Sequence, residues 1–220
     1  MIPIADIDVD PAFPASLAMG LPCVDEIDEE GYGNFRDVWS IGEVSHEEAV
    51  RMIETERSLV GLVDQASRNA AEFEAMARAV ETGELENLPN GYVAENPHSD
   101  IVRFLSAIDE EQSTLDALEL GVAGLAYALS SVGCFTAASC RSHYSDHSWA
   151  DRPVVFFAAE RPTVHWLTPL VQDSGCGFAD GSDRAVRLLV MQAPSITNFL
   201  DLAQGIVEQV SRQGPTRPSP

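Results

Sequence analysis

Lysine is absent from this chain of 220 residues, in which all 13 basic residues are arginine. The absence excludes a P-loop nucleotide-binding protein, a pyridoxal enzyme and a protein kinase, because each of them needs a lysine at its reaction centre. The 35 acidic residues outnumber the arginines, so that the formal charge is −22 and the isoelectric point is about 4.3. Since a broad nucleic-acid interface requires clustered cations, this balance argues against such an interface.

Cysteines and long apolar runs are also scarce. No uncharged run approaches the roughly 20 residues that span a bilayer, and the opening MIPIADIDVD lacks the basic and apolar stretches of a signal peptide. We therefore expect a cytoplasmic protein without membrane association. The cysteines are too few for a disulfide scaffold in a chain of this length, which favours free thiols or metal ligands. They are Cys23, Cys134, Cys140 and Cys176.

The negative charge is distributed unevenly along the chain. Residues 1–44 carry a net charge of −9, residues 45–112 of −10, and residues 113–220 of only −3. This difference predicts two structurally distinct parts. An acidic N-terminal half could present its charge to a basic protein partner, as an inhibitor, an immunity protein or an adaptor does, because electrostatic steering speeds association. The sequence indicates no particular oligomeric state.

The N-terminal half divides into an irregular and a helical region. Residues 1–44 form an acidic segment with little periodicity, in which only IPIADIDV alternates as a short strand does. Ser45 opens the sequence SHEE, which matches a capping box and predicts a helix start. Apolar residues then recur at spacings of three, four or seven as far as Gly83, which predicts one long helix or a helix broken near Gly61. We expect region 45–112 to be helical.

The C-terminal half alternates between helical and strand patterns. Three short apolar runs, CFTAA, PVVFFAA and RLLVM, predict buried strands. Helices are expected from Pro162 to about Asp173 and from Pro194 onward. A further helix ending at Gly133 is predicted by apolar residues spaced three and four apart, namely Leu115, Leu118, Val122, Leu125 and Leu129.

These elements predict the fold class of the chain. Residues 113–212 should form an α+β domain of two layers, a sheet with helices on one face, preceded by the long helical N-terminal region. Residues 213–220 contain three prolines and predict a disordered tail.

The connection between the first two predicted strands, from Ser139 to Arg152, is far longer than a hairpin requires. Long loops in compact domains often carry function. This loop concentrates reactive and aromatic side chains: Cys140, Arg141, His143, Asp146, His147, Trp149, Asp151 and Arg152.

The sequence around this loop follows a recognisable pattern. A predicted helix ends in Gly133, a strand with Thr136 follows, then the loop sequence SCRSH, and then the apolar strand PVVFF. Over residues 120–158 the chain resembles small, mostly uncharacterised bacterial and phage proteins with a Ser-Cys-x-Gly-His loop. The resemblance implies a shared fold segment and a functional loop. Ser142 stands where those proteins usually have glycine, at the position that would make the tight turn.

Three chemistries are compatible with the loop, and the first is metal binding. The spacing Cys-x5-Cys-x2-His-x3-His supplies the donor atoms of tetrahedral zinc, although the first interval exceeds the usual two to four residues. His165 or Cys176 could replace the first cysteine. The candidate ligands are Cys134, Cys140, His143 and His147. The expected cofactor is therefore either none or zinc.

The second chemistry is nucleophilic catalysis. Cys140 would attack, Arg141 would stabilise its thiolate, and His143 or His147 would act as the base. Asp146 and Asp151 are the candidates for orienting that base. The alternative is that Cys140 is a small buried residue, as free cysteines often are.

The third chemistry is anion recognition, because arginine forms bidentate contacts with carboxylates and phosphates. The alternative is that these arginines form salt bridges with the acidic N-terminal half. Five arginines lie near predicted strand ends: Arg141, Arg152, Arg161, Arg184 and Arg187. We favour binding over catalysis, since no complete catalytic constellation is present.

Overall fold

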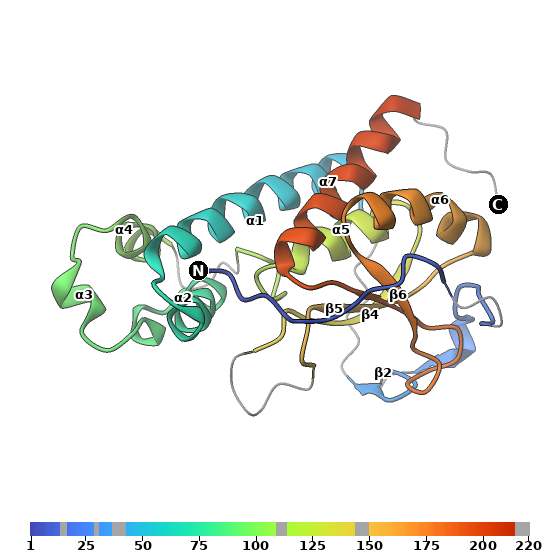
Figure 1. Cartoon of the computed structure of the whole chain (residues 1–220), viewed down its shortest axis with the longest axis horizontal. Coiled ribbons are helices and arrows are strands. Elements are labelled where there is room, and N and C mark those ends of the chain that lie inside the picture. Colours follow the sequence, from blue (N-terminus) through green and yellow to red (C-terminus); the bar gives the residue numbers. More distant parts are fainter. Residues whose placement is uncertain (14–16, 29–30, 37–42, 109–113, 144–149, 214–220) are drawn as a thin grey trace.

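A four-stranded antiparallel sheet forms the centre of the fold in the computed structural model (Figure 1). The structure describes residues 1–13, 17–28, 31–36, 43–108, 114–143 and 150–213. The strand order is β4-β5-β7-β6, and each neighbouring pair is antiparallel. The strands are β4 (Phe135–Cys140), β5 (Val154–Ala158), β6 (Gly177–Asp180) and β7 (Leu189–Gln192). The three predicted apolar runs are thus β4, β5 and β7.

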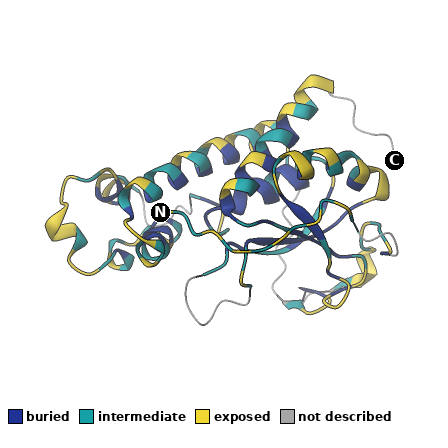
Figure 2. Cartoon of the chain, in the orientation of Figure 1, coloured by how far each residue is buried: buried dark blue, intermediate teal, exposed yellow. Residues whose placement is uncertain are grey.

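Helices α5 (Ala123–Ser131), α6 (Arg161–Asp173) and α7 (Ile196–Gln213) lie on one face of this sheet (Figure 1). Alternate strand residues such as Phe157 and Met191 share a buried cluster with helix residues. Figure 2 shows the burial concentrated between the helices and the sheet. The predicted α+β class, with a sheet and a helical layer, is confirmed.

The opposite face of the sheet is partly covered by a small second sheet. Its strands are β1 (Ile27–Asp28), β2 (Gly31–Tyr32) and β3 (Phe35–Arg36), preceded by the 3-10 helix η1 (Val24–Glu26). The ring of Tyr32 packs edge-on against Phe135 with centroids 5.5 Å apart, and that of Phe35 packs against Phe156 at 4.9 Å. We predicted an irregular segment here, because strands of two residues leave no readable period.

Residues 43–108 contain α1 (His46–Ala66), α2 (Ala70–Thr82), η2 (Leu85–Asn87), α3 (Tyr92–Glu95) and α4 (Asp100–Ala107). The capping box is confirmed, since the Ser45 hydroxyl accepts from the Glu48 amide. The long helix breaks at residues 67–69 and not near Gly61, because the Asn69 side chain caps a new helix there. Helix α1 packs against α5 and α7.

The predicted helix through the Leu115–Leu129 stripe is wrong in its first half. Helix α5 begins only at Ala123, and the preceding chain takes left-handed backbone angles at Asp116, Ala117 and Gly121 (φ 50°, 64° and 99°). Such angles interrupt a right-handed helix. The apolar residues before Ala123, such as Leu115, are spaced as in a helix because they are buried in a turn, not because they share a helical face.

The N-terminal segment is extended but forms no strand within residues 1–13. Ala5 donates its N–H to the Pro194 carbonyl at 2.8 Å, and Phe178 donates to the Asp10 carbonyl at 2.7 Å. The segment therefore runs past the start of α7 to β6. None of the described helices is long and apolar enough to cross a membrane. Residues 214–220 of the predicted tail lie outside the described residues.

Candidate functional site

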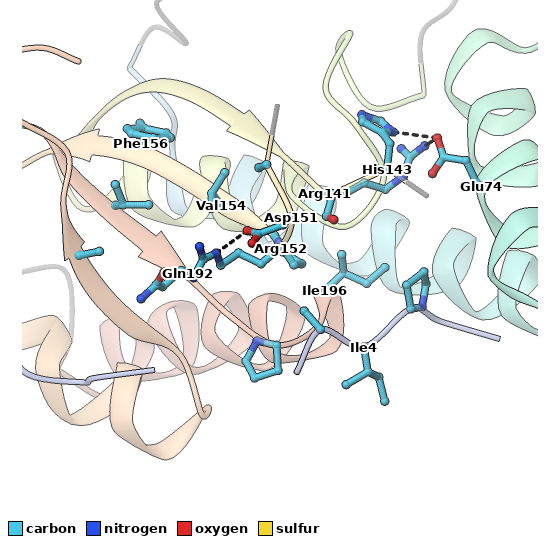
Figure 3. A pocket seen from close by; sticks show the side chains of 18 of the residues that line it. Ile4, Glu74, Arg141, His143, Asp151, Arg152, Val154, Phe156, Gln192 and Ile196 are labelled. Atoms are coloured by element: carbon cyan, nitrogen blue, oxygen red, sulfur yellow. Dashed lines mark hydrogen bonds and ion pairs between the residues drawn. The ribbon is translucent and has the colours of Figure 1, made fainter. Parts of the chain in front are cut away.

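A groove of about 800 Å³ lies on the four-stranded sheet, on the face opposite the helices and beside the area that β1–β3 cover (Figure 3). Its floor consists of Val154 and Phe156 from β5, Val190 and Gln192 from β7, and Ala179 from β6. The period of two in these strands turns their other side chains to the helical layer, so the floor and the main core are opposite faces of one sheet. Most of the floor is apolar, with one amide among it.

The walls of the groove come from segments far apart in the sequence. One wall is the N-terminal segment 3–5 together with Pro194 and Ile196, and one end is closed by Phe73 and Glu74 of α2. The groove is lined by charged residues of both signs and by the imidazole of His143. The arginines are Arg141, Arg152 and Arg184, and the acids are Glu74, Asp151, Asp180 and Asp183. The described ends of the loop that the sequence singled out, residues 141–143 and 150–152, thus line the groove.

A buried arginine organises the end of the groove next to α2. The Arg141 side chain is only 2% exposed, and its guanidinium pairs with Glu74 at 3.0 Å and with Glu81 in a closer contact. Burial lowers the pKa of Arg141, but the surrounding carboxylates outweigh burial and raise this pKa above its usual value. Burial also raises the pKa of Glu81 to about 7, against the opposing effect of Arg141. Arg141 therefore holds α2 to the loop by charge.

His143 lies between two carboxylates beside this arginine. Its Nδ1 is 2.7 Å from Glu74 Oε1, and its Nε2 is 2.9 Å from Glu119 Oε1. The other oxygen of Glu119 accepts the backbone N–H of Arg141 at 2.8 Å. Burial raises the pKa of Glu74, but Arg141 and His143 outweigh it, so that this pKa is lower than usual. Both ring nitrogens of His143 therefore have carboxylate neighbours.

Cys140 ends β4 at the same place and has no exposed surface. Ser142 donates its backbone N–H to the Cys140 sulfur at 3.4 Å. This contact depends on a left-handed backbone at Ser142, with φ at 70°. The tight turn that the resemblance associates with glycine is thus present with serine in its place, at a cost of about 1–2 kcal/mol for a residue with a Cβ.

The structure brings together two of the four predicted metal ligands and separates a third. Ligand atoms of Cys140 and His143 lie within 4.8 Å of each other and of a Glu119 oxygen. Cys134 instead packs among the helix-side core residues, where burial raises its pKa to about 12. Cys176, the substitute we considered, lies in that same core, and burial raises its pKa to about 12 as well.

Other predicted participants lie elsewhere or outside the described residues. His147, Asp146 and Trp149 lie outside them. The His165 ring packs edge-on against Phe13 at 4.9 Å on α6. We predicted that Arg141 would stabilise a Cys140 thiolate. In the structure the ion pairs of its guanidinium are instead with Glu74 and Glu81 of α2.

The five predicted anion-binding arginines divide between two roles. Arg141, Arg152 and Arg184 line the groove. Arg161 donates to the Leu17 carbonyl at 3.3 Å, and Arg187 pairs with Glu26 at 2.8 Å. Both therefore hold the N-terminal segment, but only Arg187 does so through a salt bridge. Arg141 also forms salt bridges with the acidic N-terminal half, through Glu74 and Glu81, as the alternative predicted.

Sequence reasoning missed the three glutamates of this site. Glu74 and Glu81 are seven residues apart and so lie on one face of α2, beside its apolar stripe. That spacing was the available signal. Glu119 lies in the turn before α5, where no local pattern singles it out.

The fold and the site together define a class: a two-layer α+β protein with a ligand-sized groove on the open face of its sheet. Comparison of the chain with models of protein families, with curated proteins and with solved structures finds no match.

Proposed function

We propose that this protein binds a small anionic molecule with an apolar body in the groove on the open sheet face. The volume of about 800 Å³ falls in the range of roughly 300–1,000 Å³ that is typical of small-molecule sites. The observation that carries the proposal is the convergence of Arg152 and Arg184 on one apolar floor from two separate loops. Arg152 precedes β5, and Arg184 lies between β6 and β7.

Both arginines are placed to exchange their present partners for a ligand. In the described part of the chain, each forms its ion pair with the acidic residue before it, Arg152 with Asp151 at 2.8 Å and Arg184 with Asp183 at 3.7 Å. Both aspartate side chains are 76% exposed. Exposed pairs contribute about 0–1 kcal/mol, so a carboxylate, sulfonate or phosphate of a ligand can replace them at little cost. Arginine also forms two parallel hydrogen bonds with such groups.

The side chains on the floor of the groove would contact the apolar body of the ligand. Val154, Phe156 and Val190 offer side chains but no hydrogen-bonding groups, and the Gln192 amide adds one donor and one acceptor. A ligand that covers this floor gains about 25 cal/mol for each Å² of apolar surface removed from water. An inorganic anion alone makes no use of the floor, so the proposal favours amphipathic anions.

The test uses 8-anilinonaphthalene-1-sulfonate, an aromatic molecule with one sulfonate, whose fluorescence rises in apolar sites. We expect one molecule to bind per folded chain, and Arg152→Gln and Arg184→Gln each to weaken binding by about tenfold, because a charge-assisted hydrogen bond contributes about 1.5–3 kcal/mol. Fluorescence titration measures the affinity. Arg212→Gln on α7, which removes an exposed pair with Glu208, is the matched control and should bind as the parent does.

Two outcomes contradict the proposal. One is equal affinity of the Arg152→Gln/Arg184→Gln double variant and the Arg212→Gln control, and the other is equal binding of the uncharged analogue N-phenyl-1-naphthylamine. Because this dye also binds partly unfolded chains, each variant is first shown to unfold at the same urea concentration as the parent.

A further inference from the structure

We propose that a zinc site with Glu119, Cys140 and His143 as protein ligands lies beside the end of the groove next to α2, where His143 lines the groove. One ligand atom from each lies within 4.8 Å of the other two. A thiolate, an imidazole and a carboxylate form a donor set that suits zinc and not magnesium or calcium, which prefer oxygen ligands alone. The site does not depend on what the groove binds.

The spacing of His143 and Glu119 already approaches that of two zinc ligands. His143 Nε2 and Glu119 Oε1 are 2.9 Å apart. Two ligands with zinc bonds of about 2.0–2.1 Å lie about 3.3 Å apart in a tetrahedron. The ion therefore fits between these atoms after a separation of a few tenths of an ångström.

Glu74 orients the histidine as an outer carboxylate does in zinc proteins. His143 Nδ1 is 2.7 Å from Glu74 Oε1, so an N–H at Nδ1 can donate to this carboxylate while Nε2 binds the ion. Ligating histidines generally donate their second nitrogen to a carboxylate or carbonyl in this way. Arg141 holds Glu74 in turn at 3.0 Å, and its side chain is almost completely buried. Glu74 is thus a positioning residue, and Figure 3 shows its carboxylate next to the side chains of His143 and Arg141.

The turn after β4 prepares the thiol for the metal. The backbone N–H of Ser142 donates to the Cys140 sulfur at 3.4 Å, a hydrogen bond that a metal-bound sulfur can also accept. The left-handed backbone of Ser142 folds the chain back, so that His143 approaches the residue three positions earlier. This strained conformation is of the kind that persists where surrounding contacts hold a functional geometry.

The net charge of the cluster also favours a divalent cation. The guanidinium of Arg141 pairs with Glu74 and Glu81, and its backbone N–H donates to Glu119, so three carboxylates accompany one guanidinium. Zinc adds two positive charges and displaces the thiol proton of Cys140 to solvent, which leaves the cluster closer to neutrality. Three protein ligands leave a fourth position for water, as in catalytic zinc sites.

Cobalt(II) reports on this site directly, because a thiolate bound to cobalt gives a charge-transfer absorption in the near ultraviolet. The full chain is prepared as Cys23→Ser, since Cys23 is the exposed cysteine, and is freed of metal with a chelator. We expect one Co²⁺ to bind per chain with this band and with visible bands of tetrahedral strength. One equivalent of Zn²⁺ should abolish both.

The variants separate ligands from bystanders. Cys140→Ser should lose the charge-transfer band, His143→Gln and Glu119→Gln should weaken cobalt binding at least about tenfold, and Glu74→Gln should weaken it by about 10–100-fold with the band retained. Cys176→Ser, a matched buried thiol in the helix-side core, should leave spectrum and affinity unchanged.

Several results overturn the site. They are the absence of a charge-transfer band in the parent, its persistence in Cys140→Ser, or its loss in Cys176→Ser. If Cys140→Ser does not fold, the Glu119→Gln variant is used instead. Glu119 is partly exposed, and its replacement by the isosteric amide creates no cavity. Unchanged cobalt affinity in Glu119→Gln contradicts the proposal. Dye binding to metal-free protein is measured separately, so failure of either proposal leaves the other intact.

Discussion

Glu56→Ala is expected to lower the free energy of unfolding by about 4 kcal/mol or more. The side chain of Glu56 on α1 is completely buried, and its two oxygens accept the backbone N–H groups of Gly121, Ala123 and Gly124, each at 2.8 Å. Truncation leaves three buried donors without partners, at about 1–3 kcal/mol each. Because domains are stable by only about 5–15 kcal/mol, the variant should unfold at a much lower urea concentration. Circular dichroism measures the transition.

Glu54→Ala is the matched control for this experiment. Glu54 lies on the same helix but is exposed, so its replacement should change stability by less than about 0.5 kcal/mol. If both variants unfold alike, the start of α5 does not depend on Glu56. Gly124 gives a structural reason for the close fit, since a Cβ at this position would lie 2.6 Å from a Glu56 oxygen.

The same carboxyl should make stability depend on pH. Burial raises the pKa of Glu56 from 4.5 to about 7, outweighing the three N–H donors that lower it. The folded chain therefore holds this proton more tightly than the unfolded chain, so the contribution is fully present below pH 4.5 and is lost as the pH rises to about 7. Relative to Glu56→Gln, the parent should lose up to about 3 kcal/mol between pH 4.5 and 8. A difference that grows in the opposite direction contradicts the assignment.

Arg141→Met is expected to cost about 3–5 kcal/mol. The substitution keeps much of the side-chain volume but removes the guanidinium that pairs with Glu74 and Glu81, and buried carboxylates without a cation are strongly destabilising. Urea unfolding measures the loss. Adding Glu81→Gln to Arg141→Met should recover part of it, because one of the stranded carboxylates is then neutral.

Arg152→Met serves as the comparison at the same groove. Its pair with Asp151 is exposed, and the expected loss is under about 1 kcal/mol. Equal losses in Arg141→Met and Arg152→Met would show that the buried pairs do not hold α2 to the loop after β4. The binding of a basic protein partner by the acidic N-terminal half stays a prediction.

Local patterns in the sequence were sufficient for much of the fold. The capping box at Ser45, the apolar runs of β4, β5 and β7, and helices α6 and α7 depend on residues within a few positions of one another. Caps and periods of this kind act within single elements, so they can be recognised without knowledge of the rest of the chain. The reactive loop after β4 was recognisable in the same way, from its length and its side chains.

Contacts between distant segments decided the remainder. Helix α5 starts at Ala123 because Glu56, 65 residues before Gly121, supplies acceptors for its first N–H groups, and no apolar spacing could show this. Two-residue strands β1–β3 likewise exist through their packing on the main sheet.

The candidate site was likewise predictable from the sequence only in part. The sequence by itself determined that Cys140, Arg141 and His143 lie together where a strand meets a long loop, and that this loop belongs to an α+β fold. Only the tertiary structure decided which residues they meet. Helix α2 brings Glu74 and Glu81, and the turn before α5 brings Glu119, whereas Cys134 and Cys140 belong to buried clusters on opposite faces of the sheet. The physical reason is that charge pairing acts through space, whereas sequence patterns report only on neighbours along the chain.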